Sequence, residues 1–108
     1  MKISLSKAEI NELFTSRQNH STRFFAGRWA NNTLKYPRVA FAFSRTKGNA
    51  ILRNRFKRRF RDMIRRELDG IGIDIIILAK KPLRDIANSS WQKEKYAWKK
   101  FFDDIKAK

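Results

Sequence analysis

The chain has 108 residues, and its 26 Lys plus Arg against 10 Asp plus Glu give a formal net charge of +16. Hydrophobic residues make up 42% of the chain, enough for a core despite the charge, so we predict one folded domain over residues 1–108. The absence of cysteine excludes disulfides, thiolate catalysis and cysteine-bound metal, and the single histidine, His20, cannot supply a two-histidine acid–base pair.

No apolar run approaches the ~18 residues that a membrane span needs, and no apolar signal segment follows the start of the chain. These absences predict a cytoplasmic protein without membrane contact. The large positive charge predicts a polyanionic partner, with nucleic acid first, because cations laid on phosphates release condensed counterions.

The first predicted element is a short helix near the start of the chain. Ser6 and Glu9 have the spacing of a capping box, and Ile10, Leu13 and Phe14 share one apolar face. The polar residues 15–21 predict a loop after this helix.

Two strands are predicted next, over residues 22–29 and 38–44, with a turn at 31–32. In the second strand, Val39, Phe41 and Phe43 alternate with Ala40 and Ala42, so the large side chains share one face. The alanines on the other face indicate either a bulky element packed closely there or a shallow open groove, and the pattern does not choose between them.

Gly48 and Asn49 end this strand and cap a long helix, which ends at Asp69 and Gly70. The β-branched run over 71–79 predicts a central strand buried on both faces, and a capping box at Ser89 begins a last helix. The order αββαβα predicts an α+β fold, an α/β sandwich in which helices pack on a small mixed sheet.

The long helix carries the functional prediction. Between Arg45 and Arg66 the chain has ten basic residues and one acid, Asp62. At 100° per residue one face of the helix is apolar and the other cationic, while Arg53 and Lys57 lie on the apolar side, from which long stems can reach a ligand beside the sheet. Arginine favours RNA, because its planar group binds phosphate in two places and stacks on unpaired bases.

Other functions fit this pattern less well. A membrane helix would need its apolar face free, but here that face must cover the sheet. A nuclease that works alone would need converging carboxylates, and the acids of this chain are scattered. A non-catalytic ribosomal or general RNA-binding protein remains the main alternative, ahead of a DNA reader that would place the helix in a major groove.

The segment 44–62, SRTKGNAILRNRFKRRFRD, resembles the signature of the bacterial ribonuclease P protein component, with Arg53, Asn54 and Arg55 at its centre. The resemblance extends to the first helix and to the strand at 74–79. It implies a left-handed βαβ crossover, where right-handed ones are the default.

The resemblance also implies a function. Proteins of this family bind a catalytic RNA, which uses Mg²⁺ to remove the 5′ leader from precursor tRNA, so the protein alone is not expected to cut and no protein metal ligand or obligate protein partner is predicted. It implies RNA-subunit contacts by Arg45, Lys47, Asn49, Arg53, Asn54, Arg55, Lys57, Arg58 and Arg61. It implies leader contacts by Phe14, Phe25 and Arg17, although burial of the two rings in the core is an equally good expectation.

Two positions depart from the family pattern. Ile10 stands where the family usually has an aromatic residue, and Thr46 where it usually has a lysine. Lys47 occupies a position that is usually apolar and can return the missing charge one residue along. We expect weaker leader stacking from the first departure.

Overall fold

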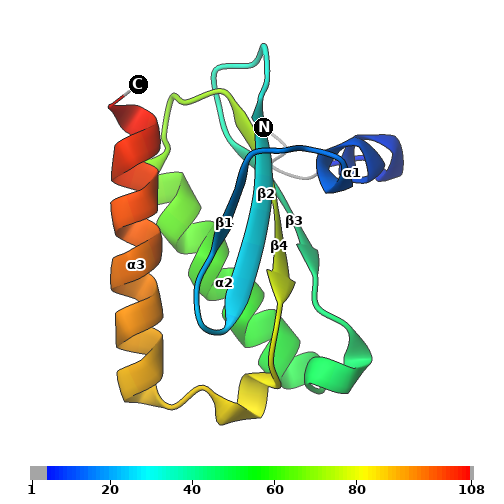
Figure 1. The fold of residues 1–108 in the computed structure, drawn as a ribbon, viewed down its shortest axis with the longest axis vertical. Coiled ribbons are helices and arrows are strands. Elements are labelled where there is room, and N and C mark those ends of the chain that lie inside the picture. Colours follow the sequence, from blue (N-terminus) through cyan, green and yellow to red (C-terminus); the bar gives the residue numbers. More distant parts are fainter. Residues whose placement is uncertain (1–4, 108) are drawn as a thin grey trace.

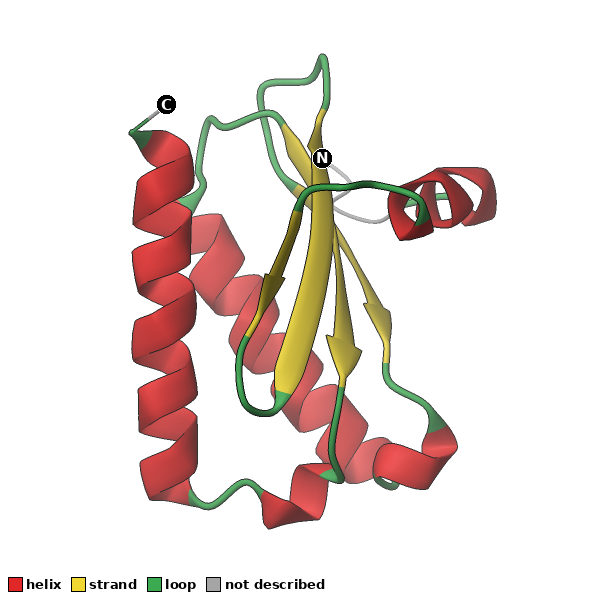
Figure 2. Cartoon of the chain, viewed as in Figure 1, coloured by secondary structure: helices red, strands yellow, loops and turns green. Residues whose placement is uncertain are grey.

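The structure is a computed structural model that describes residues 5–107. Its elements are α1 (Lys7–Phe14), β1 (Asn19–Ser21), β2 (Phe25–Asn31), β3 (Arg38–Ala42), α2 (Ala50–Glu67), β4 (Ile73–Ala79) and α3 (Asn88–Lys106), with short 3₁₀ turns η1 (Arg45–Lys47) and η2 (Leu83–Asp85). Figure 1 and Figure 2 show one sheet with α2 and α3 on one face and α1 on the other. The predicted α+β sandwich is confirmed.

The sheet has the strand order β1-β2-β4-β3. β2 pairs antiparallel with β1 and β4, whereas β3 and β4 are parallel and joined through α2. In Figure 1 both parallel strands run downward, β4 lies to the left of β3, and α2 passes behind the sheet. This path makes the crossover left-handed, as the family resemblance implied.

The core lies between the sheet and the two long helices. β2, β3 and β4 direct alternate side chains toward it, and Phe25, Phe60, Trp98 and Phe102 are fully buried there. The ring of Phe60 meets Trp98 edge to face at 5.4 Å between centroids. Aromatic residues thus supply most of the apolar volume on this face of the sheet.

The opposite face of the sheet carries small side chains, and α1 packs on part of it. Leu13 is buried against Ala40 and Ile76, with Ile10 beside them. The alanines therefore admit a closely packed helix, which answers the question that the strand pattern left open. Ala26 and Ala42, farther along the same face, stay half-buried.

Most local predictions are confirmed. Ser6 and Glu9 form the capping box, the Asn49 side chain accepts a hydrogen bond from the Leu52 backbone N–H at 2.9 Å, and Gly70 has a φ of 78° just past the end of α2.

Among residues 5–107, no helix has both the length and the apolar character that a membrane crossing requires.

Three predictions need correction. Residues 19–21 form the edge strand β1 rather than a loop, because β2 supplies backbone partners to a polar segment that has no apolar alternation. The next strand begins at Phe25, since the Thr22 N–H bonds to the Phe25 carbonyl in the hairpin turn. Ser89 does not cap α3: the N-cap is Ala87, two residues earlier, and it makes no side-chain cap hydrogen bond.

Candidate nucleic-acid interface

Helix α2 has one apolar side and a basic surface. Phe56, Phe60, Met63 and Ile64 are buried against the sheet and α3. Within the part of the chain that the structure describes, none of the arginines or lysines of α2 forms an ion pair, since the four ion pairs belong to Arg38 and Lys106. The charges of α2 are therefore available to solvent ions or to an external anion.

Three basic residues form a line along one flank of α2, which we call the β3 flank. Arg53, Lys57 and Arg61 are each four residues apart and so lie on one side of the helix. Arg53 and Lys57 are half-buried, as their place on the apolar side predicted, and the Arg53 Nε atom is buried without a hydrogen-bond partner. The Arg61 guanidinium lies 5.3 Å from the centre of the Phe41 ring of β3.

The remaining predicted RNA-subunit residues surround this flank. Asn54, Arg55 and Arg58 are exposed on the outer side of α2, and Asn49 is its exposed N-cap. Arg45 is exposed in η1, directly before the helix. The structure thus brings the predicted set together on and beside a single helix.

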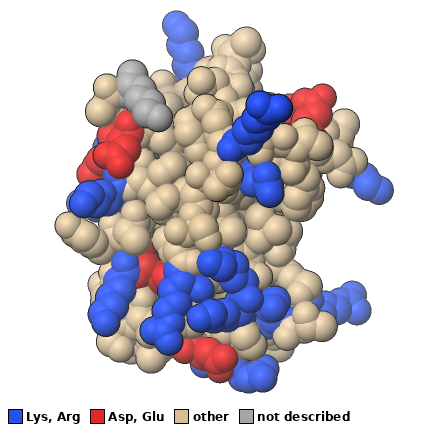
Figure 3. Space-filling view, in the orientation of Figure 1, with Lys and Arg blue, Asp and Glu red and all other residues tan. Residues whose placement is uncertain are grey.

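A further basic surface continues from η1 to the β1–β2 turn, and sequence reasoning missed it. Lys47 Nζ donates to the Lys80 carbonyl at 3.3 Å, and Lys80 Nζ donates to the Ser21 hydroxyl and the Thr22 carbonyl, both at 2.8 Å. Arg23 and Lys81 both lie over the Phe24 ring, at 5.2 and 5.5 Å from its centre. Figure 3 shows basic side chains gathered over this lower part of the molecule.

The available signal for this surface was a pair of lysines directly after the buried strand, next to Pro82. Only the hairpin pairing of β1 and β2 brings Arg23 to the same end of the molecule. A basic residue in a turn is ordinary in itself, and Arg23 becomes part of this basic surface only through the pairing of β1 with β2.

The predicted leader-binding rings occupy opposite environments. Phe14, at the end of α1, is 42% exposed. Phe25 is fully buried and packs edge to face on Phe60, with 4.8 Å between ring centroids. Because a ring without exposed surface cannot stack on a base, the expected leader contact by Phe25 is wrong for this conformation, and the alternative of a core residue holds.

The face of the sheet beside α1 offers other groups. Arg28 lies on this face and donates to the Ser16 carbonyl at 2.8 Å, and Arg17 is exposed in the neighbouring turn. Leu78 of β4 pairs in register with Ala26 and Ala42, and these three half-buried residues form an apolar row across the sheet. The only signal for Arg28 in the sequence was its position in the predicted strand 22–29, and β2 begins three residues later than that prediction, at Phe25.

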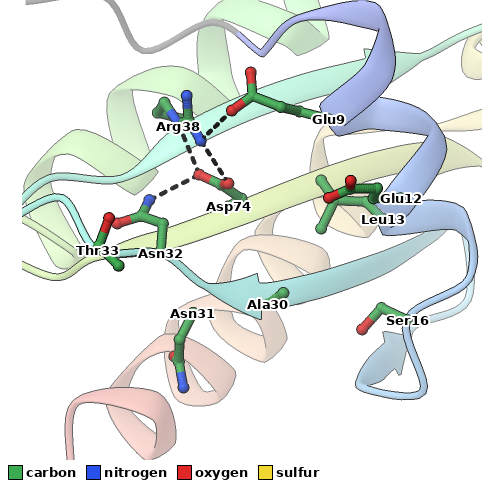
Figure 4. Close-up of a pocket in the computed structure, with 10 residues that line it drawn as sticks. All are labelled: Glu9, Glu12, Leu13, Ser16, Ala30, Asn31, Asn32, Thr33, Arg38 and Asp74. Carbon is green, nitrogen blue, oxygen red and sulfur yellow. Dashed lines mark hydrogen bonds and ion pairs between the residues drawn. The ribbon is translucent and has the colours of Figure 1, made fainter.

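At the other end of this face, a polar node fixes α1 to the sheet. Arg38 donates to both carboxylate oxygens of Asp74, at 2.9 and 2.8 Å, and pairs with Glu9 of α1 at 2.6 Å (Figure 4). The hydrogen bonds of the Ser6 cap, followed by Arg38, hold the pKa of Glu9 below its usual range. A hollow of 460 Å³ lies beside the node, between α1 and the sheet.

No metal centre accompanies these groups in the described part of the chain. Among residues 5–107, no three His, Asp or Glu side chains lie together in a way that could hold a metal ion. What the arrangement offers is cations, the exposed ring of Phe14 and a small-residue sheet face, which suit the binding of a single-stranded polyanion.

Comparison with known proteins identifies the family. The family model described as Ribonuclease P matches residues 4–105. The chain belongs to the ribonuclease P protein family. A Ribonuclease P protein component of Mesoplasma florum is 30% identical over 96 residues, which cover 86% of this chain and 87% of the relative.

The one from Fusobacterium nucleatum is 45% identical over 65 residues, but the match covers 58% of this chain and only 55% of that relative's length. Solved structures agree with the ribonuclease P protein fold. The Staphylococcus aureus RNase P protein superposes with a TM-score of 0.74 at 24% identity, covering 86% of this chain and 88% of its own. The Thermotoga maritima protein gives 0.66 at 21% identity, with 94% and 93% covered.

Proposed function

We propose that this chain is the protein subunit of a ribonuclease P ribonucleoprotein and assists removal of the 5′ leader from precursor tRNA. The observation that carries the proposal is the unneutralised basic surface of α2, which bears the Arg-Asn-Arg motif in a chain of this family. Catalysis is assigned to the RNA subunit with its Mg²⁺, and no residue of this chain is assigned to the metal.

The RNA subunit docks on α2 and on η1, the short turn that precedes this helix. Half-buried Arg53 and Lys57 project from packed stems, so their charged ends lose little conformational freedom on binding phosphate. Arg55, Arg58 and Arg61 present further donors from the same helix. Each bound phosphate releases counterions, which makes the affinity depend steeply on salt.

The single-stranded leader lies on the sheet face beside α1. Phe14 offers an exposed ring on which a base can stack, worth on the order of 1–3 kcal/mol per base. Arg17 and Arg28 supply cations for the leader phosphates near that ring. The apolar row of Ala26, Leu78 and Ala42 carries no long side chain, so a chain of nucleotides can approach the sheet closely.

The test is cleavage of a 5′-extended precursor tRNA at low Mg²⁺, with this protein alone, with a bacterial ribonuclease P RNA alone, and with both. We expect efficient cleavage only with both. Arg53→Ala with Arg55→Ala should then reduce the affinity for the RNA subunit. Cleavage by the protein alone would contradict the division of labour, and failure to help the RNA would leave a general RNA-binding protein.

The leader contact has a matched control. Phe14→Ala should weaken binding of leader-bearing precursor more than binding of mature tRNA, whereas Tyr96→Ala on α3 removes a 70% exposed ring elsewhere and should change neither. Equal effects of the two variants would contradict the role of Phe14.

The two departures from the family pattern can be tested in the same assay. Ile10 packs beside Leu13 under α1, and Thr46 is exposed in η1 with its hydroxyl 2.8 Å from that of Ser44. Ile10→Phe and Thr46→Lys should each strengthen leader binding. If neither changes the affinity, both departures are neutral.

A further inference from the structure

A basic groove lies between α2 and α3, on a side of α2 that the proposed contacts above do not use. Its volume is about 150 Å³, which is enough for a phosphate group with a few waters. The groove is formed by side chains from both helices: Arg59, Asp62, Met63, Arg66, Trp91 and Lys95.

Arg59 is held in place by aromatic rings. Its guanidinium lies 5.0 Å from the centre of the Phe56 ring and 5.4 Å from that of Trp91, and both rings are buried. A guanidinium over ring faces is positioned without being neutralised, and its N–H donors remain available at the edge of the plane. The groove therefore has a fixed cation at its floor.

The groove is also unbalanced in charge. Arg59, Arg66 and Lys95 face a single carboxylate, Asp62, and in the described residues none of these four side chains forms an ion pair. Asp62 and Arg66 have the i,i+4 spacing at which such pairs commonly form. Three cations around one unpaired carboxylate leave a net positive site that an anion can enter.

The groove and the β3 flank lie on different sides of α2. Arg59 follows Lys57 by two residues, which at 100° per residue puts the two side chains about 200° apart around the helix axis. One flank faces β3 and the other faces α3. A nucleic acid segment bound on one flank leaves the other flank free.

We propose that the α2–α3 groove binds a backbone phosphate of a second RNA segment, so that RNA is held on both sides of α2. The proposal rests on the proposed function, because the partner is the same RNA subunit. Arg59 and Arg66 donate to the phosphate oxygens, and Lys95 closes the site from α3. Asp62 limits the affinity of the groove by repulsion.

Site-specific cross-linking tests this placement, and the absence of cysteine in the chain makes single-cysteine labelling clean. A photoactivatable group is attached to Lys95→Cys in the groove, to Arg58→Cys on the outer side of α2, and to Lys100→Cys on exposed α3 outside the groove. Each labelled protein is irradiated with a bacterial ribonuclease P RNA, and the modified nucleotides are mapped by primer extension.

We expect the labels at positions 95 and 58 to modify different RNA segments, and the label at 100 to modify little. Modification from 95 no stronger than from 100, with normal modification from 58, would overturn the groove and leave the proposed function intact. No modification from any position would overturn both.

Salt dependence gives a second test without labels. The double variant Arg66→Gln with Lys95→Gln keeps Arg59 on its rings, and Lys93→Gln with Lys100→Gln removes the same charge from exposed positions outside the groove. Loss of the phosphate contact in the groove should lower the slope of log affinity against log salt by roughly 0.7 to 0.9 for the first pair.

The second pair should leave that slope nearly unchanged, and Asp62→Asn should tighten binding because it removes the repulsive carboxylate. Equal slopes for the two double variants would overturn the proposal, since the effect would then follow net charge and not the groove.

Discussion

The two faces of the sheet are built on opposite principles. The face toward α2 and α3 carries large aromatic and β-branched side chains that are almost fully buried, whereas the face toward α1 carries alanines, a leucine and the polar node of Arg38. Both faces belong to the same three strands, on alternate residues. The contrast teaches that the large apolar side chains are concentrated on one face, while the face of small side chains is covered by α1 only in part.

The largest test of this contrast removes an aromatic residue from the packed face. Phe60→Ala should lower the free energy of unfolding by about 3 to 5 kcal/mol, because Phe60 is fully buried among Phe25, Trp91 and Trp98 and leaves a cavity. Urea denaturation followed by tryptophan fluorescence measures this free energy. Phe14→Ala, on the other side of the sheet, should lower the free energy of unfolding far less. Equal decreases for the two variants would contradict the contrast between the faces.

The next effect comes from the polar node. Arg38→Met should lower the free energy of unfolding by about 2 kcal/mol, because it leaves the mostly buried Asp74 carboxylate with only its hydrogen bond from Asn32 and releases Glu9. Arg38→Met with Asp74→Leu should recover much of this loss, since no unpaired charge remains. If the double variant is less stable than the single one, the node contributes more than charge pairing.

A single methyl group sharpens the comparison further. A Cβ at Gly27 would lie 3.0 Å from the Trp98 ring, which is itself confined by Phe60 and Phe102, so Gly27→Ala should cost about 1 to 2 kcal/mol. The neighbouring Ala26 points to the other face, and Ala26→Val should be nearly neutral in thermal unfolding. A destabilising Ala26→Val would show that this face is packed as tightly as the first.

The smallest effect concerns pH. Burial lowers the pKa of His20, against the opposing influence of Glu94 and Asp104, and its ring stacks on Phe101 at 4.2 Å. The unfolded chain then binds a proton more readily than the folded one, so stability should fall as pH drops from 7 toward the folded pKa. His20→Phe should flatten this slope in melting temperatures measured from pH 7 to 5, and an unchanged slope would exclude His20 as its source.

The predictions that succeeded depend on neighbours in sequence. The caps at Ser6 and Asn49, the left-handed Gly70 and the two faces of α2 all follow from residue types a few positions apart. Two of the predictions that failed depend on partners distant in sequence. β1 exists because β2 pairs with it, and Phe25 is buried because α2 and α3 converge on it.

The same division applies to the candidate site. The basic surface and the apolar side of α2 were both evident from helical periodicity, which is a local property of the chain. The basic groove between α2 and α3, the position of Arg28 and the link from Lys47 to the β1–β2 turn were decided by tertiary packing. Periodicity states which residues share a side of one element, but contacts between elements depend on how each buries its apolar surface against the others, and only the folded chain resolves that competition.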